Sequence, residues 1–256
     1  MPINKSDKKF VRPPEKFSKQ QIEAWVKEEA QTIGLDLPID LVETEEWADY
    51  VNHHHFVPNS VEDIPEGYEF DYNWAKDENP RRGLPCAEVI ETGQFRLWWD
   101  RCNYYEMPED KCRQFIKGAV RHEYGHYIQW QKIAITVLSA IGYNVDSKKL
   151  PAILTDVEAF AGAKEAFMRI WADPAHYQCR EVEVYTTQIE NGEMAKDTMS
   201  ESDWVRRLSA VYVYAHGNKN SPGCENSKWA LEFSAFIKKA DELFKANNIQ
   251  PQKPVK

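Results

Sequence analysis

Residues 121–127 read Arg-His-Glu-Tyr-Gly-His-Tyr. In a helix, His122 and His126 stand four residues apart, so both imidazoles lie on one face and can reach the same cation. Glu123 lies about 100° further round the helix, beside such a cation rather than on it. From there its carboxylate can take a proton from a metal-activated water. This stretch therefore predicts a helix that carries two metal ligands and a general base.

The spacing of the two histidines and the glutamate is the H-E-x-x-H motif, which is typical of zinc peptidases. Phe115 and Ala119 precede His122 and His126 at helical spacing. We therefore expect the histidines to continue the core-facing side of their helix. A β-hairpin is expected over residues 87–100, with its turn at Thr92-Gly93. It could supply an edge strand that aligns an extended peptide.

The remaining pattern predicts a mostly helical α+β fold. Pro108 suits the first position of the helix that carries the motif. This helix is expected to run to about Gln131 or a little beyond. Another helix should follow the Ser18 cap and end at Gly34. Further helices are expected over 133–141, 151–171, 176–190, 201–215 and 227–246, with a strand as the competing interpretation of 182–187.

The chain is expected to form one domain. Residues 1–17 are rich in lysine and proline and predict a flexible tail. Residues 18–250 should form the single domain, composed of an N-terminal part (18–86), a metal-site core (87–171) and a helical C-terminal part (172–250).

Composition excludes some classes of protein. The chain has 256 residues, with 32 basic and 41 acidic side chains, and the resulting net charge of −9 argues against a nucleic-acid binder with a broad basic surface. The five cysteines are odd in number and show no C-x-x-C spacing, so we expect no disulfide framework and a reducing compartment. No apolar leader opens the sequence, and the longest apolar run, 133–141, is too short to span a bilayer. We expect a cytoplasmic protein.

A tetrahedral catalytic site needs a third protein ligand. The positions that mark a metzincin hold Gln129 and Lys132, which excludes that class. A cysteine ligand, as in peptide deformylases, would come from Cys86, Cys102 or Cys112, none of which lies in the local motif of that family.

A carboxylate from a later helix is the third possibility, and Glu158 is the first choice. It follows His126 by 32 residues, and the small residues at 159 and 161–163 would let its helix approach the histidines closely. Glu181 is the main rival. Three other carboxylates stay open, namely Asp156, Glu165 and Glu183.

With these residues the chain resembles the gluzincin clan of metallopeptidases. The stretch 122–126 followed by Glu158-Ala159-Phe160-Ala161 is similar to the paired-helix signature of that clan. The aromatic-glycine form of the motif is similar to the catalytic domain of anthrax lethal factor and to antirepressor-type peptidases. The match covers about residues 87–171. The aspartate that follows the glutamate ligand by four residues in the thermolysin group is replaced by Gly162, or by Tyr185 if Glu181 is the ligand.

The resemblance implies a zincin-like domain that binds Zn²⁺ and hydrolyses a protein or peptide substrate. Glu123 would act as the general base, and neither a nucleic-acid nor a membrane partner is implied. A donor to the oxyanion is also expected. Its candidates are Tyr143, His176, Tyr185, Tyr212 and His216.

Two other functions stay open. One is a metal-dependent hydrolase of a non-peptide amide, and the other is a non-catalytic protein that keeps the metal for structure or regulation. A crosslink-repair protease on DNA is disfavoured, because the chain has neither a zinc-ribbon cysteine pattern nor a basic bias. The run His53-His54-His55 is either a solvated loop or part of a second metal site.

Overall fold

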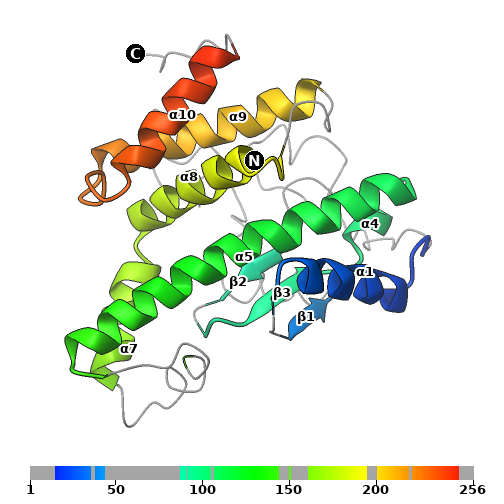
Figure 1. Ribbon diagram of the computed structural model, residues 1–256, viewed down its shortest axis with the longest axis horizontal. Helices are drawn as coiled ribbons and strands as arrows, with labels where there is room; N and C mark the ends of the chain where they lie inside the picture. The colour runs from blue at the N-terminus through cyan, green and yellow to red at the C-terminus, as the bar shows by residue number, and fades with distance from the viewer. Residues whose placement is uncertain are drawn as a thin grey trace, which may run out of the picture. The chain divides into compact units, whose positions relative to one another are not determined.

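The chain divides into two compact units. One comprises Met1–Glu88 with Phe95–Val120, and the other comprises Val89–Gln94 with Arg121–Lys256. Helices dominate and a small sheet completes the expected α+β fold (Figure 1). The computed structural model describes residues 15–35, 38–43, 87–90, 92–104, 107–143, 150, 161–194, 201–218 and 221–247.

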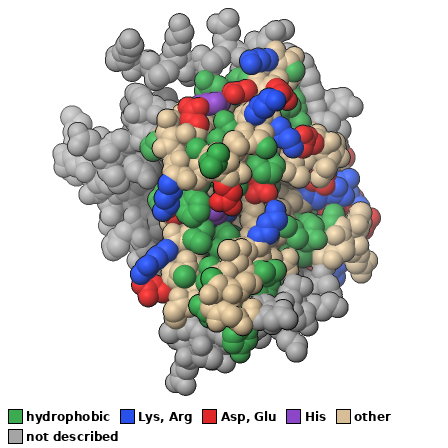
Figure 2. Space-filling view, turned by 60° about the vertical axis from the view of Figure 1, so that its left-hand side comes forward, with side chains coloured by type: hydrophobic (Ala, Val, Ile, Leu, Met, Phe, Trp, Pro, Cys, Tyr) green, Lys and Arg blue, Asp and Glu red, His purple; other side chains and the backbone are tan. Residues whose placement is uncertain are grey.

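Charged side chains of both signs are interspersed on the face shown in Figure 2. Basic and acidic groups alternate there with hydrophobic ones. The described residues on this face therefore form no broad basic area.

The first unit opens with helix α1 (Lys19–Thr32). The Ser18 hydroxyl accepts a hydrogen bond from the backbone N–H of Gln21 at 3.2 Å, which confirms the predicted cap. Gly34 follows the helix with a φ of 68°, a conformation that glycine adopts without strain. The buried face of the helix carries Ile22, Trp25, Val26 and Ala30.

A three-stranded sheet has the order β1-β3-β2. Strand β1 (Ile39–Val42) runs parallel to β3 (Phe95–Trp98), and β2 (Ala87–Val89) lies at the other edge. The expected hairpin is confirmed in β2 and β3. In β3 and just after it, Trp98 and Asp100 are buried as well as their neighbours Leu97 and Trp99.

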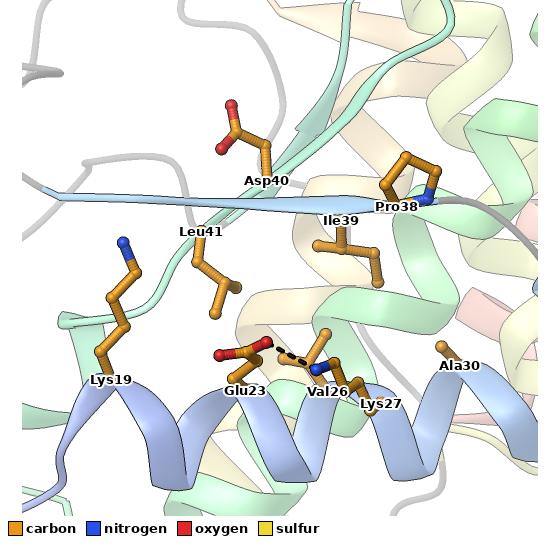
Figure 3. A pocket seen from close by; sticks show the side chains of 9 residues that line it. All are labelled: Lys19, Glu23, Val26, Lys27, Ala30, Pro38, Ile39, Asp40 and Leu41. Atoms are coloured by element: carbon orange, nitrogen blue, oxygen red, sulfur yellow. Dashed lines mark ion pairs between the residues drawn. The ribbon is translucent and has the colours of Figure 1, made fainter.

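A groove of about 400 Å³ lies between α1 and β1 (Figure 3). Ile39 and Leu41 point toward the helix, and Asp40 points away from it. On the helix side, Lys27 pairs with Glu23 at 2.6 Å. Strand β1 thus presents its apolar side chains to α1, as the two-residue period of a strand requires.

The chain before α1 is anchored at its end. Phe17 is buried, and the side chain of Asn103, in the short helix α4 (Arg101–Tyr104), donates to its carbonyl and accepts from its N–H, both at 2.8 Å. Lys16 donates its backbone N–H to the same oxygen of Asn103. The last residues of the expected tail are therefore held in place.

The prediction that the cysteines form no disulfides is wrong. Cys102 pairs with Cys112 in the first unit, and Cys179 pairs with Cys224 in the second. The partners are 10 and 45 residues apart, so only the tertiary fold brings them together. Because disulfides persist in oxidising surroundings, the cysteines no longer support the expected reducing compartment. Cys86 lies outside the described residues.

The motif lies on one continuous helix, α5 (Glu109–Ala140). The predicted break near Gln131 is wrong, because residues 127–140 contain neither glycine nor proline. The helix ends before Gly142, which has a φ of 83°. Neither α5 nor any other helix of the described segments is long and apolar enough to cross a membrane.

The second unit adds helices to the last part of α5. Helix α8 (Pro174–Glu190) begins at the N-cap Asp173, slightly earlier than the predicted range, and residues 182–187 are helical despite their β-branched side chains. Helices α8, α9 and α10 pack around Cys179, Val182 and Val211 (Figure 1). This burial outweighs the weak strand preference of valine and threonine. The other elements are α7 (Ala161–Trp171), α9 (Glu201–His216), β4 (Gly217–Asn218), β5 (Ser221–Pro222), η4 (Cys224–Asn226) and α10 (Ser234–Ala246).

The last helix starts later than predicted. Residues 228–233 form turns, and α10 begins at Ser234 rather than at Ser227. The Ser227 hydroxyl donates to the carbonyl of Cys224 at 2.7 Å and accepts from the N–H of Trp229. The indole of Trp229 in turn donates to Asp173. These contacts hold the segment against the start of α8.

Candidate metal centre

Three side chains of the second unit converge on one point. His122 and His126 come from α5, and Glu181 comes from α8. The two Nε2 atoms are 3.2 Å apart. The Glu181 carboxylate lies 3.3 Å from Nε2 of His122 and 3.2 Å from Nε2 of His126, through its two different oxygens. Among the described residues, this is the group of histidine, cysteine and acidic side chains that could hold a metal ion.

The three side chains form a triangle small enough to hold one metal ion. Ligand atoms about 2.0–2.1 Å from a tetrahedral centre are about 3.3–3.4 Å from one another. The Nε2–Nε2 distance of 3.2 Å is close to this edge, and each Nε2 has a different oxygen of Glu181 at 3.2–3.3 Å. The three side chains are therefore close enough to share one metal ion.

Gly125 allows α8 to come close enough to deliver Glu181. A Cβ atom at this position would lie 3.0 Å from both methyl groups of Val184. A larger residue in the centre of the motif would therefore push α8 outward. The sequence pattern predicts that small residues after Glu158 let the ligand-bearing helix approach the histidines. In the structure, Gly125 has this role for α8.

The other ring nitrogen of each histidine is bound to a glutamine. His122 Nδ1 lies 3.0 Å from Oε1 of Gln188, and His126 Nδ1 lies 2.9 Å from Oε1 of Gln129. An amide oxygen only accepts hydrogen bonds, so each Nδ1 carries the hydrogen. In the neutral imidazoles, both Nε2 lone pairs then face the carboxylate of Glu181.

The carboxylate of Glu181 favours a positive charge between itself and the two histidines. Burial alone would raise the pKa of Glu181, but the charge of His126 and hydrogen bonds from both histidines hold it well below its usual range. Burial alone would lower the pKa of His122, but the hydrogen bond and charge of Glu181 outweigh it and raise the pKa to about 9. Without a metal, a proton therefore occupies the place that a cation would take.

Glu123 lies beside the triangle. Its carboxyl is buried, and burial raises its pKa, although the charges of His126 and His122 oppose this. The backbone N–H of Val89, in β2, donates a hydrogen bond to it. A carboxylate that is short of water and has a raised pKa is suited to accepting and returning a proton.

Two tyrosines of α8 adjoin the site. Tyr177 donates its hydroxyl to Glu181, and the ring of Tyr185 lies 4.6 Å from that of His122. Burial and the charge of Glu181 raise the pKa of both phenols, that of Tyr185 to about 12. Both therefore stay protonated and can donate a hydrogen bond. Sequence reasoning missed Tyr177, although it stands one helical turn before Glu181.

The other expected oxyanion donors lie in different surroundings. His176 packs against Trp229 and Phe233, and Tyr212 packs against His216 and Phe244. On α5, His126 is as deeply buried as Glu123, and both histidines face Glu181 of α8. Tyr143 is half-exposed just beyond the end of α5.

The remaining candidate ligands either make other contacts or lie outside the described residues. Glu165 is exposed and pairs with Arg169, and Glu183 accepts a hydrogen bond from Gln129. The residues that lie outside the described part of the chain are Glu158, Asp156 and His53-His54-His55.

No family model matches the chain, and neither a curated protein nor a solved structure matches it.

Proposed function

We propose that the protein is a zinc-dependent metallopeptidase of the gluzincin type. His122, His126 and Glu181 are its metal ligands, and Glu123 is its general base. The observation that carries the proposal is the convergence of the three ligand groups, with the two Nε2 atoms 3.2 Å apart and an oxygen of Glu181 at 3.2–3.3 Å from each of them.

The donor set favours zinc among the common metals. Two imidazole nitrogens and one carboxylate oxygen, with a fourth position free, are the ligands of a catalytic zinc site. Magnesium and calcium prefer sites built from oxygen atoms alone. The two glutamines support the same assignment, because they leave both Nε2 lone pairs available.

The chain's own residues divide the chemistry between them. When bound, zinc would polarise a carbonyl group and make a water molecule acidic near neutral pH. Glu123 takes the proton of the attacking water and then returns it to the leaving amine. Tyr177 donates its one hydroxyl hydrogen to Glu181 and so orients that ligand. Tyr185, beside His122, can donate to a developing oxyanion.

Strand β2 suggests how a peptide would be held. It is an edge strand among the described residues, and its Val89 contacts Glu123 directly. An extended substrate that pairs with such an edge would lie alongside the general base. This supports a peptide rather than another amide as substrate.

Metal content tests the ligand set. We expect native mass spectrometry to find one zinc per chain in the wild type and in Glu158→Ala, the matched control. His126→Ala and Glu181→Ala should lose it. A wild type that binds no zinc, or a Glu181→Ala variant that keeps it, would overturn the assignment.

Hydrolysis of a peptide library tests the enzyme function. Glu123→Gln should keep the zinc and lose about 10²–10⁴-fold in rate, because the amide cannot accept the proton. If this variant cleaves peptides as fast as the wild type, Glu123 is not the base. If neither cleaves any peptide, the protein is not a peptidase.

A further inference from the structure

We propose that Gln129 is a positioning residue of the metal centre. It fixes the imidazole of His126 and connects it, through its side-chain amide, to the carboxylate of Glu183. The inference builds on the proposed metal site and adds to it a residue that touches no metal.

The side chain of Gln129 is buried, with 4% of its surface exposed, and its hydrogen bonds determine its orientation. Its Nε2 donates to the backbone carbonyl of Arg180 at 3.1 Å and to Oε2 of Glu183 at 2.6 Å. Both partners are acceptors only. The amide therefore cannot be flipped, and Oε1 has to face His126.

This fixed orientation determines which nitrogen of His126 can bind a metal. Oε1 of Gln129 lies 2.9 Å from Nδ1 of His126 and cannot donate to it. Nδ1 must carry the hydrogen, so the lone pair is at Nε2, which faces His122 and Glu181. Gln129 thus selects the tautomer and holds the ring plane of the ligand.

Glu183 gives the glutamine an electrostatic role as well. Its side chain is mostly buried, and its second oxygen is 3.3 Å from Nζ of Lys132. Its negative charge polarises the amide of Gln129, which makes Oε1 a stronger acceptor for the Nδ1 hydrogen of His126. The imidazole would become a better electron donor, while Gln129 and His126 separate the carboxylate from the metal site.

A glutamate at position 129 would not preserve this arrangement. Its carboxylate would face two acceptors, the carbonyl of Arg180 and the carboxylate of Glu183. Exchanging the two side chains, in Gln129→Glu with Glu183→Gln, keeps the net charge and lets the new amide donate to the new carboxylate. The exchange should therefore restore part of what Gln129→Glu loses.

Zinc affinity, measured by competition with a chelator, tests the proposal on the full chain. We expect Gln129→Leu to weaken zinc binding about 10–100-fold, the usual effect of removing a hydrogen-bond partner of a ligand. The isosteric Glu183→Gln keeps the hydrogen-bond geometry and should weaken binding severalfold. The matched control is Gln131→Leu on the same helix, whose amide donates to Tyr127 rather than to the site, and it should bind as the wild type does.

The cobalt(II) spectrum gives a second measurement. The ligand-field bands should shift in Gln129→Leu, recover in part in the exchanged double variant, and stay unchanged in Gln131→Leu. Wild-type affinity and an unchanged spectrum in both Gln129→Leu and Glu183→Gln would overturn the inference and leave the proposed function standing. A wild type that binds no zinc would overturn both.

Discussion

Gly125 belongs to the H-E-x-x-H stretch and also lies against α8 in the tertiary structure. A Cβ atom there would come within 3.0 Å of the Val184 methyl groups. We expect Gly125→Ala to displace α8, weaken metal binding at least about tenfold and cost about 1–3 kcal/mol through overpacking. Chelator competition and urea unfolding measure the two effects.

The same helix offers a matched control for this substitution. Gly118 has open space where a Cβ would be added. Gly118→Ala should therefore raise the free energy of unfolding by about 0.5–1 kcal/mol, because alanine favours a helix. Adding Val184→Ala to Gly125→Ala should restore metal binding. If Gly125→Ala alone binds metal as the wild type does, the close approach of α8 does not depend on this glycine.

His176 makes stability depend on pH. It is 3% exposed, and burial, together with the charge of Arg180, lowers its pKa from 6.5 to about 4. Between these values the unfolded chain binds more protons than the folded one, so stability falls as the pH is lowered from about 6.5 to about 4. The shift corresponds to a loss of up to roughly 3 kcal/mol.

Replacing the histidine isolates its contribution. His176→Phe should unfold with a flatter pH dependence than the wild type, when both are measured in urea at pH 7 and pH 4.5 with a chelator present. Phenylalanine can pack against Trp229 and Phe233 as the histidine does. Equal pH dependence in the two proteins would show that His176 does not titrate in this range.

At the scale of elements, a disulfide joins the ligand-bearing helix α8 to η4. Cys179, which precedes Glu181 by two residues in α8, is bound to Cys224 in η4. In the chain-entropy model, this bond contributes roughly 4 kcal/mol to stability, and the shorter Cys102–Cys112 loop contributes roughly 3 kcal/mol.

Thiol titration and unfolding test these bonds. We expect one free thiol per chain before reduction and five after it, since the sequence has five cysteines and the two bonds use four. Cys179→Ala with Cys224→Ala should lower the free energy of unfolding more than Cys102→Ala with Cys112→Ala. Five free thiols in the unreduced protein would contradict both disulfides.

At the scale of the whole molecule, all three proposed ligands belong to the second unit. A metal that binds only the folded state stabilises it by about 4 kcal/mol at a thousand times its dissociation constant. Chelation should therefore lower the unfolding midpoint. Hydrogen exchange should increase in residues 121–140 and in α8 more than in α1. Equal increases in both units would show that the metal does not act through the second unit alone.

Much of this protein is determined by its sequence. The H-E-x-x-H spacing places two imidazoles on one face of any helix, and the Ser18 and Asp173 caps and Gly142 mark helix ends through local hydrogen bonds and backbone preferences. These interactions join residues within one or two helical turns. The α+β class and the positions of His122, Glu123 and His126 could therefore be predicted.

Contacts between distant segments were decided by the tertiary structure. Glu181 meets histidines more than 50 residues earlier, because Gly125 admits α8 and because Val182 is buried in the core of the second unit. The disulfides and the glutamine that orients His126 depend on the same packing. The local sequence around each glutamate or cysteine does not show which glutamate joins the histidines or which cysteines pair. The packing of α8 against α5 selects Glu181, because burial favours one arrangement of the helices over the others.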